Sequence, residues 1–431
     1  MVLRKGQPPP PVGPFAISKV VSVEMMPGAI TFRDRVAMFV VRFVNLLSRR
    51  LGRGAGTVAG GRVGLRVSPK LLNHLAAGRV VVLVTGTNGK TTTAAMVGAG
   101  WGGEVALNQT GSNMTEGHLA AMVDSDSPHV VLEVDEKWLE QVVRATQPRV
   151  VLLLNLSRDQ LDRTNEVRAI AEQWRRLWAN GEGINEDTVI VANVNDPLVV
   201  YAAASARHVR WCDVETTWLA DATSCPHCTR ALRFSPSGWS CDCGFSRPTP
   251  TTIQRGDHVV IDGTDFTLRL ALPGTFNAAN AAMALTALAT LDVPVDDARA
   301  RVSQLSNVAG RFSRRHWRGH ELLLTLAKNP AGFSAMLDTV QEIPDEIWIA
   351  INARVADGRD PSWLYDVPFE LLRGRRVYCF GDRRLDLATR LDLAGVTFEL
   401  SSEDSPPPPT GPVTVLANYT AFQDWLERSS T

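Results

Sequence analysis

Short, continuously apolar runs separated by amphipathic stretches dominate the chain. The runs are rich in β-branched residues, which is typical of strands buried on both faces of a parallel sheet. They predict strands at residues 80–84, 130–135, 150–155, 189–193, 321–326, 346–352, 376–380 and 413–416. The amphipathic stretches predict helices at residues 32–50, 69–78, 167–179, 281–291, 332–340, 386–394 and 421–426. Strands that alternate with helices predict an α/β fold with a doubly wound, mostly parallel sheet.

Changes in composition predict how the chain is divided. Residues 1–31 are rich in Pro and Gly and lack a period, so we expect a disordered extension, with Met25, Met26 or Met38 as alternative starts. Residues 32–310 are expected to form a central domain, and residues 311–431 a smaller α/β C-terminal domain. Within these, we expect a flexible glycine-rich loop at residues 52–64 and a polar, Pro-rich loop at residues 401–409.

The predicted helix at residues 32–50 has two interpretations. Its apolar run, residues 36–41, is too short to span a bilayer and is followed by Arg42, Arg49 and Arg50. The helix either packs on another domain or contacts a membrane surface with its apolar side. The Pro-rich N-terminus lacks the apolar core of a secretory signal. Both interpretations predict a cytoplasmic protein, and the second places it at the inner face of the membrane.

Composition and charge narrow the class of protein. A length of 431 residues predicts two or three domains. Apolar residues make up 45% of the chain and charged residues 21%, which indicates a globular protein. The 45 basic and 45 acidic side chains cancel, so the charge gives no indication of a nucleic-acid partner.

The first candidate site begins where the first predicted strand ends. Residues 80–93 read VVVLVTGTNGKTTT, a strand followed by a glycine turn, a Lys-Thr pair and a helix start. This order predicts a phosphate-binding loop, in which backbone N–H groups face the anion, Lys90 adds a positive charge and the Thr91 hydroxyl binds Mg²⁺. The glycine spacing is shorter than in the common motif, which would place a glycine at Val84. A chance glycine turn is the alternative, and the order of the four elements argues against it.

Polar residues at the ends of the next strands extend this site. Glu133, Asp135 and Asn155 fall at the carboxyl edge of the predicted sheet, where ligands bind in doubly wound folds. Glu133 is the candidate to complete the oxygen ligands of Mg²⁺. A solvated acid at a strand end is the alternative for Glu133, and Asp135 and Glu136 fit plain surface charge equally well.

A cysteine cluster is the second candidate site. Four of the six cysteines form a C-x-x-C pair and a C-x-C pair, Cys225 with Cys228 and Cys241 with Cys243. Two close pairs in turns are what tetrahedral Zn²⁺ requires, so we expect a structural zinc-ribbon insertion at residues 213–248. The short second pair leaves three alternatives. His227 replaces a thiolate, the site is strained, or the cysteines are thiols in a zinc-free loop.

Several motifs together resemble the Mur ligases, the amide-forming enzymes of peptidoglycan synthesis, and folylpolyglutamate synthase. Residues 86–92 resemble their ATP loop, which has the same short glycine spacing, and residues 155–163 resemble their Asn-x-x-x-Asp-His-Leu-Asp segment. The resemblance implies that ATP is held by Gly86, Thr87, Asn88, Gly89, Lys90, Thr91, Thr92, Glu133, Asn277, Asn280 and Arg311, and Mg²⁺ by Thr91 and Glu133. Asn277 would also cap the following helix.

Departures from the classical ligases then favour one branch. Gln160 stands where the usual motif has His, and no lysine lies between Lys137 and Lys328 to serve as the carbamoylated lysine. Residues 326–333 and 352–366 also differ from the classical pattern, and the cysteine insertion is additional. This set resembles the MurT family, the Mur-ligase-like subunits of lipid II isoglutaminyl synthase.

The resemblance implies a reaction and a partner. In that family a GatD subunit, a glutamine amidotransferase, releases ammonia from glutamine. The MurT subunit uses ATP to activate the α-carboxylate of D-glutamate in the stem peptide of lipid II, through an acyl phosphate, so that ammonia gives D-isoglutamine. An aspartate of the C-terminal domain completes the catalytic triad of the partner, and Asp360 is preferred here over Asp357. The alternative for either is a loop aspartate that caps a turn.

Two other functions remain open. One is a stand-alone amino-acid ligase of the Mur or folylpolyglutamate type, against which the missing lysine argues. The other is a non-catalytic nucleotide-binding scaffold, against which the intact Lys90-Thr91 pair and Glu133 argue.

Overall fold

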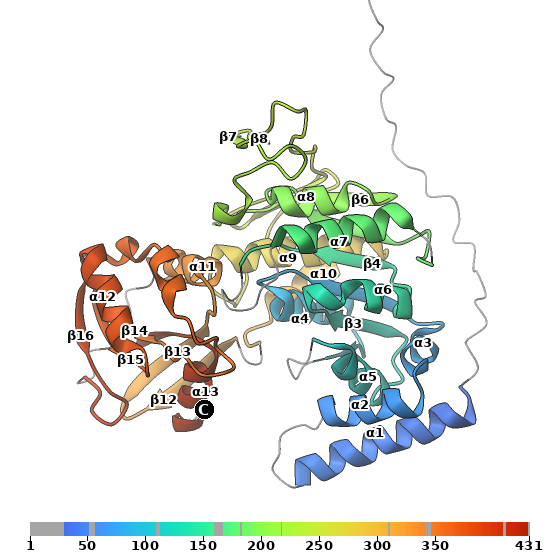
Figure 1. Cartoon of the computed structure of the whole chain (residues 1–431), viewed down its shortest axis with the longest axis horizontal. Helices are drawn as coiled ribbons and strands as arrows, with labels where there is room; N and C mark the ends of the chain where they lie inside the picture. The colour runs from blue at the N-terminus through green and yellow to red at the C-terminus, as the bar shows by residue number, and fades with distance from the viewer. Residues whose placement is uncertain are drawn as a thin grey trace, which may run out of the picture.

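The computed structural model describes residues 30–50, 57–108, 113–158, 167–181, 183–216, 218–308, 311–341, 343, 346–407 and 411–429. The predicted extension therefore lies almost entirely outside the described residues. Two α/β units follow one another along the chain, and Figure 1 shows the C-terminal unit beside the larger N-terminal one. The predicted α/β class is confirmed.

A nine-stranded sheet forms the larger unit, in the order β11-β10-β9-β6-β5-β4-β1-β3-β2. Its strands are β1 (Val80–Thr85), β2 (Ala106–Leu107), β3 (His129–Glu133), β4 (Val150–Leu153), β5 (Val189–Asn193), β6 (His208–Asp213), β9 (Thr252–Arg255), β10 (His258–Ile261) and β11 (Thr264–Thr267). All pairs from β2 to β9 are parallel, and β9, β10 and β11 pair antiparallel. Strands β1, β3, β4 and β5 match the predicted apolar runs, whereas β2, β6 and β9 to β11 were not predicted.

Helices cover both faces of this sheet (Figure 1). One face packs against α4 (Lys90–Trp101), α9 (Thr275–Thr290) and α10 (Val295–Ser303), and the other against α3 (Leu71–Ala76), α5 (Thr115–Val123), α6 (Leu139–Thr146), α7 (Val167–Asn180) and α8 (Pro197–Ala203). In β1, Val82 and Val84 belong to the first core while Val81 and Leu83 belong to the second. Because consecutive strand residues point to opposite faces, both must be apolar.

The predicted glycine-rich loop at residues 52–64 is wrong in its second half, which is helix α2 (Thr57–Val67). Its glycines allow backbones to approach closely rather than to bend. A Cβ at Gly61 would lie 2.1 Å from the carbonyl oxygen of Glu116 on α5, and one at Gly64 would lie 2.4 Å from Val41 on α1 (Phe32–Arg50). Composition alone predicted a loop because the helices that require these glycines are distant in sequence.

The C-terminal unit is a six-stranded sheet in the order β12-β13-β17-β14-β15-β16. Its strands are β12 (Phe312–Trp317), β13 (His320–Leu326), β14 (Glu346–Ala350), β15 (Arg376–Phe380), β16 (Thr397–Leu400) and β17 (Val413–Ala417). One face packs on α11 (Pro330–Gln341) and α12 (Arg384–Ala394), and the other on α13 (Tyr419–Arg428). Only β12 is antiparallel to its neighbour.

Candidate functional site

The loop between β1 and α4 has the backbone of a phosphate cradle. Gly86 and Gly89 both have positive φ, 138° and 87°, which side chains rarely adopt. The space around them is also taken, since a Cβ at Gly86 would lie 2.9 Å from the backbone nitrogen of Asn155. Gly89 is the N-cap of α4, so the unpaired N–H groups and positive dipole end of this helix face the loop.

Lys90 is buried at the first position of α4 and folds back over the loop. Its Nζ donates hydrogen bonds to the carbonyl oxygens of Gly86 (2.6 Å) and Thr87 (3.3 Å), and it lies 3.3 Å from a carboxylate oxygen of Glu136. The ion pair places the single positive charge of the loop beside Glu136, which was only a weak candidate for the site in the sequence. Asp135 instead accepts from the backbone N–H of Lys137 and caps η1 (Glu136–Trp138).

Thr91 brings the two halves of the chain together. Its Oγ1 donates to the carboxylate of Glu133 at 2.7 Å and accepts from Nη2 of Arg311 at 3.1 Å. Glu133 is buried at the end of β3, so it is not a solvated strand-end acid. A hydroxyl and a buried carboxylate at this separation are oxygen ligands of the kind that Mg²⁺ prefers.

The segment after β4 is hydrogen-bonded to the phosphate loop. Asn155 accepts from the backbone N–H of Asn88 at 2.9 Å and returns a bond to the carbonyl oxygen of Asn88 at 3.0 Å. The Thr87 hydroxyl donates to the Ser157 carbonyl at 3.0 Å and accepts from its N–H at 2.9 Å. Residues 159–163, including Gln160, lie outside the described residues. These paired bonds hold the loop in one conformation.

A pocket lies in front of the loop and is lined by both units. Thr87, Asn88, Gly89, Lys90, Thr92 and Asn280 line it from the larger unit, and Arg311, Lys328, Gly332 and Met336 line it from the C-terminal unit. Asn277 is not among its lining residues, because it is buried and its Nδ2 donates to the carbonyl oxygen of Pro273 at 2.6 Å. The predicted helix cap at Asn277 is wrong. Helix α9 begins earlier, at Thr275, and its N-cap is Gly274.

A second cavity of about 540 Å³ opens on the other side of the start of α4. Thr91 and Glu133 line it together with apolar and small side chains, Ala94, Ala95, Gly98, Val105, Leu107, Leu305 and Val308. The candidate Mg²⁺ ligands therefore line this second cavity, while their chain neighbours Lys90 and Thr92 line the first pocket.

The two candidate aspartates of the C-terminal unit have opposite surroundings. Asp357 is buried and accepts from the backbone N–H of Thr420 at 2.8 Å, from the Thr420 hydroxyl, and from the N–H of Arg354 at 3.2 Å. Asp360 is exposed and accepts from the backbone N–H of Ser362 at 2.9 Å, at the start of η3 (Ser362–Asp366). The hydrogen bonds from Ser362 lower the pKa of Asp360, so it is ionised at neutral pH. A carboxylate offered to another protein must be exposed, which only Asp360 is.

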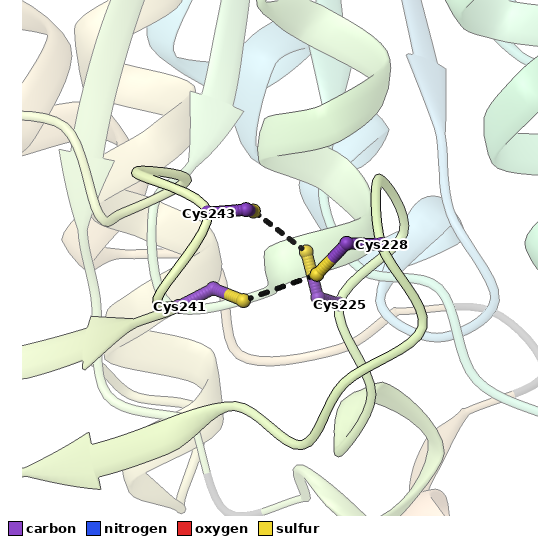
Figure 2. A group of neighbouring side chains, drawn as sticks. All are labelled: Cys225, Cys228, Cys241 and Cys243. Atoms are coloured by element: carbon purple, nitrogen blue, oxygen red, sulfur yellow. Dashed lines mark hydrogen bonds between the residues drawn. The ribbon is translucent and has the colours of Figure 1, made fainter.

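The four clustered cysteines converge on one point (Figure 2). Their sulfur atoms all lie within 4.8 Å of one another, with Cys225 and Cys243 3.6 Å apart and Cys228 and Cys241 3.4 Å apart. Four sulfurs around a tetrahedral Zn²⁺ with ordinary bond lengths would be separated by about 3.8 Å. The backbone N–H of Cys243 lowers the pKa of the Cys241 thiol to about 7, whereas burial raises the pKa of the Cys225 thiol. The cluster is compatible with zinc.

The two turns that carry the cysteines explain the short second pair. In the first, the N–H of Cys225 donates to the carbonyl oxygen of Arg230 at 2.7 Å. In the second, the N–H of Cys241 donates to the carbonyl oxygen of Phe245 at 2.7 Å, so this turn is one residue shorter. His227 is not part of the cluster, because its ring packs edge-on against Tyr201 and Phe245 with centroids 4.9 Å and 4.8 Å away.

Some residues of the site could not be singled out from the sequence. Asn329 donates from Nδ2 to Oδ1 of Asn88 at 3.1 Å and so attaches the end of β13 to the phosphate loop. Lys328 lines the pocket beside it. The only signal for this pair was its position directly after a predicted strand, in the segment that departs from the classical ligase pattern.

Two family models match consecutive parts of the chain. The Mur ligase middle domain matches residues 84–288, and the MurT ligase C-terminal domain matches residues 326–422. The first match contains most of the phosphate loop, and the second contains Asn329 and both candidate aspartates. Fold and site together thus define a Mur-ligase-type protein.

Relatives that align with most of the chain indicate which branch of the Mur-ligase-type proteins it resembles. The lipid II isoglutaminyl synthase (glutamine-hydrolyzing) subunit MurT of Staphylococcus aureus strain COL is 27% identical, in an alignment covering 92% of this chain and 98% of that protein. The subunit of the same name from Streptococcus pneumoniae is 26% identical and covers 87% and 90%. Over most of its length the chain is therefore similar to the MurT subunits, a branch of the Mur-ligase-like proteins.

Solved structures agree on the fold. A pseudomurein peptide ligase type C from Methanothermus fervidus aligns with a TM-score of 0.62 at 19% identity, covering 81% of this chain and 78% of that one. MurF from Acinetobacter baumannii aligns with a TM-score of 0.60 at 15% identity, covering 85% and 80%. Within the part of the chain that the structure describes, no helix is long and apolar enough to cross a membrane.

Proposed function

We propose that the chain is the ATP-dependent subunit of a glutamine-hydrolysing lipid II isoglutaminyl synthase. The main support for the proposal is that the phosphate loop and the C-terminal unit meet at one pocket. A phosphate loop with Lys90, Thr91 and Glu133 is bonded, through Arg311 and Asn329, to a MurT-type C-terminal unit. The names of the relatives support the same reaction. Its place of action is the cytoplasmic face of the membrane, where a lipid-linked substrate is accessible.

The reaction consists of two balanced transfers. An oxygen of the D-glutamate α-carboxylate attacks the γ-phosphorus of ATP, the bond to the β-phosphate oxygen breaks, and ADP leaves. Ammonia then attacks the acyl carbon, loses a proton, and expels phosphate to leave the amide. Lys90, Arg311 and the helix N-terminus provide positive charge for the transferring group. Thr91 and Glu133 would hold Mg²⁺, which would neutralise further charge on the phosphates.

The positions of the two pockets support an arrangement of the substrates. ATP occupies the pocket in front of the phosphate loop, with Gly86, Thr87, Asn88, Gly89 and Thr92 at its phosphates. In this arrangement Asn280 is on the nucleotide side of the pocket, and Asn277 supports the start of α9 from its buried position. The acyl substrate enters by the second cavity, which is lined by Thr91 and Glu133.

Ammonia comes from a GatD-like glutaminase subunit that binds the C-terminal unit. The exposed, ionised carboxylate of Asp360 orients the catalytic histidine of that subunit and stabilises its cation. Asp357 instead holds the segment in place through Thr420. Zinc bound by the four cysteines stabilises the insertion, since a segment of this size cannot bury a sufficient core of its own.

The test is an amidation assay of the chain co-purified with a glutaminase subunit. Lipid II should be amidated with glutamine and also with free ammonia, in both cases only with ATP. Lys90→Ala should lower both rates by about a thousandfold or more, because the transferring phosphoryl group loses its fixed charge. Arg176→Ala, which removes an exposed cation of α7 in the same unit, should leave both rates unchanged.

Two results would refute the proposal. One is coupling of an amino acid by the isolated chain with ATP, which would make it a stand-alone ligase. The other is unchanged amidation by a folded Lys90→Ala complex, which would make the chain a non-catalytic scaffold.

A further inference from the structure

We propose that helix α1 docks on an anionic membrane surface. The exposed side of α1 is a continuous apolar stripe made of Phe32, Val36, Phe39, Phe43, Leu46 and Leu47. These residues recur at helical spacing and therefore share one face. Phe32 is 83% exposed, Phe39 70% and Phe43 56%, and the rings of Phe39 and Phe43 stack with centroids 6.4 Å apart.

The opposite face of α1 is fixed to the protein, so the stripe is held outward. Ala37, Val41 and Asn45 are buried on this face against the neighbouring helices α2 and α5. Asp34, also buried, accepts from the Ser68 hydroxyl at 2.6 Å and is 2.9 Å from Nδ1 of His74. Helix α1 is therefore an integral part of the fold, and Figure 1 shows it at an outer edge of the molecule, below α2.

Charge favours a lipid surface as the occupant over a second copy of the chain. The whole chain has no net charge, but residues 30–70 contain nine basic side chains and one acidic one. The basic residues are Arg33, Arg35, Arg42, Arg49, Arg50, Arg53, Arg62, Arg66 and Lys70. The acid, Asp34, is buried, so the excess of eight positive charges is not balanced by acids within the segment. A symmetric contact between two copies would bring two such positively charged segments together, and they would repel each other.

Arginines lie on both sides of the stripe. By helical spacing, Arg33 falls on one side of the apolar face and Arg35 and Arg42 on the other, and all three are exposed. Arg42 also donates to the carbonyl oxygen of Val123 at 2.6 Å and Arg33 to that of Val67, so both side chains are bonded to the body of the protein. Aromatic and aliphatic residues flanked by arginines are typical of a helix that lies in the plane of the membrane interface.

Vesicle flotation of the complex with its glutaminase subunit tests this inference. We expect binding to vesicles of phosphatidylglycerol and phosphatidylethanolamine and weak binding to pure phosphatidylcholine. Phe39→Ser with Phe43→Ser should weaken binding by about tenfold or more, since two rings leave the acyl boundary. Leu385→Ser with Leu393→Ser removes side chains of similar exposure, 63% and 67%, from α12, and should have no effect.

A second pair of variants separates charge from apolar contact. Arg35→Gln with Arg50→Gln should weaken binding to the anionic vesicles by about tenfold. Arg176→Gln with Arg428→Gln, on α7 and α13, is the matched control. Raising the salt concentration from about 0.1 M to about 1 M, which shortens the Debye length from about 10 Å to about 3 Å, should weaken wild-type binding in the same direction.

Several outcomes would overturn the inference. They are equal flotation of the wild type and the phenylalanine variant, absence of wild-type binding, a change of oligomeric state in that variant, and loss of its glutaminase subunit. The last two would assign the stripe to a second copy or to the partner. Amidation of a water-soluble substrate analogue should be unchanged in all α1 variants, so a failure of the proposed reaction and a failure of membrane docking give different results.

Discussion

Replacement of Asp360 by Asn tests the proposed shared triad at a single functional group. Asp360 is exposed, and Asn can still accept the hydrogen bond from the backbone N–H of Ser362. The free energy of unfolding should therefore change by less than about 0.5 kcal/mol. The charge that orients the histidine of the partner is lost, however. The glutamine-driven rate should fall by about a thousandfold or more, as expected for the loss of the orienting acid of a triad.

Asp357→Asn is the matched control, because it makes the same chemical change three residues away. Its carboxylate accepts from two backbone N–H groups and one hydroxyl in a buried position. An amide offers only one acceptor oxygen, so at least one buried donor loses its partner, which costs roughly 1–3 kcal/mol. Asp357→Asn should thus lower stability, whereas Asp360→Asn should lower only glutamine use.

The assay measures amidation by the purified complex with glutamine and with ammonium at saturating ATP. For Asp360→Asn the ammonium-driven rate should equal that of the wild type, since the phosphate loop and Arg311 are unchanged. Thermal unfolding and size-exclusion chromatography confirm that the complex is intact. Full glutamine use by the Asp360→Asn complex would refute the reasoning. Equal loss of both reactions would place Asp360 outside the triad and in the ligase site or the interface.

Three further changes test other parts of the structure. Burial lowers the pKa of His118 from 6.5 to about 4, so its neutral ring contributes full stability above pH 6.5. In denaturant titrations, about 3 kcal/mol of unfolding free energy should be lost as the pH falls to 4. The unfolding free energy of His118→Gln should lack this dependence on pH. Gly61→Ala should destabilise the chain by roughly 1–3 kcal/mol in thermal unfolding, because overlap with Glu116 outweighs the better helix propensity of Ala, and a gain would contradict the close helix packing. Cys241→Ser should abolish zinc detected by elemental analysis, whereas Cys379→Ser, which changes a buried single thiol, should retain it.

The central strands could be predicted because burial on both faces requires continuous apolar sequence. Strands β1, β3, β4 and β5 of the larger sheet and β13, β14, β15 and β17 of the smaller one all have this property. The edge strand β12 reads FSRRHW and has only its first and last side chains buried. Half-buried strands carry no continuous apolar run, so β12, β6, β16 and the antiparallel strands β9 to β11 were missed.

Helix α2 shows why composition can mislead. Glycine is about 1 kcal/mol worse than alanine in a helix, so a glycine-rich segment predicts a loop. In the fold, Gly60, Gly61 and Gly64 allow α2 to contact Asn45, Glu116 and Val41 more closely than any side chain would permit. The packing energy that outweighs the local cost depends on helices far away in sequence.

The candidate site likewise has one part that could be predicted from the sequence and another that could not. The phosphate loop was predictable because its glycines, Lys90 and Thr91 are contiguous and their chemistry depends on local backbone geometry. The pairing of Lys90 with Glu136 joins residues 46 positions apart, and that of Asn88 with Asn329 joins residues 241 apart. No sequence pattern specifies such contacts, because they depend on which strand ends meet at the sheet edge.

These long-range contacts also determine how the ligase site and the segment of Asp360 are connected. Asn88 of the phosphate loop is bonded to Asn155. Three residues further along that segment, Arg158 pairs with Asp366 at 3.3 Å, and Asp366 ends the short helix η3 that begins just after Asp360. A displacement of the phosphate loop therefore acts on the segment that carries Asp360 through two contacts and one short helix. Because the Arg158–Asp366 pair is largely exposed, it contributes less than about 1 kcal/mol, so this connection can align the two sites but cannot by itself force them to move together.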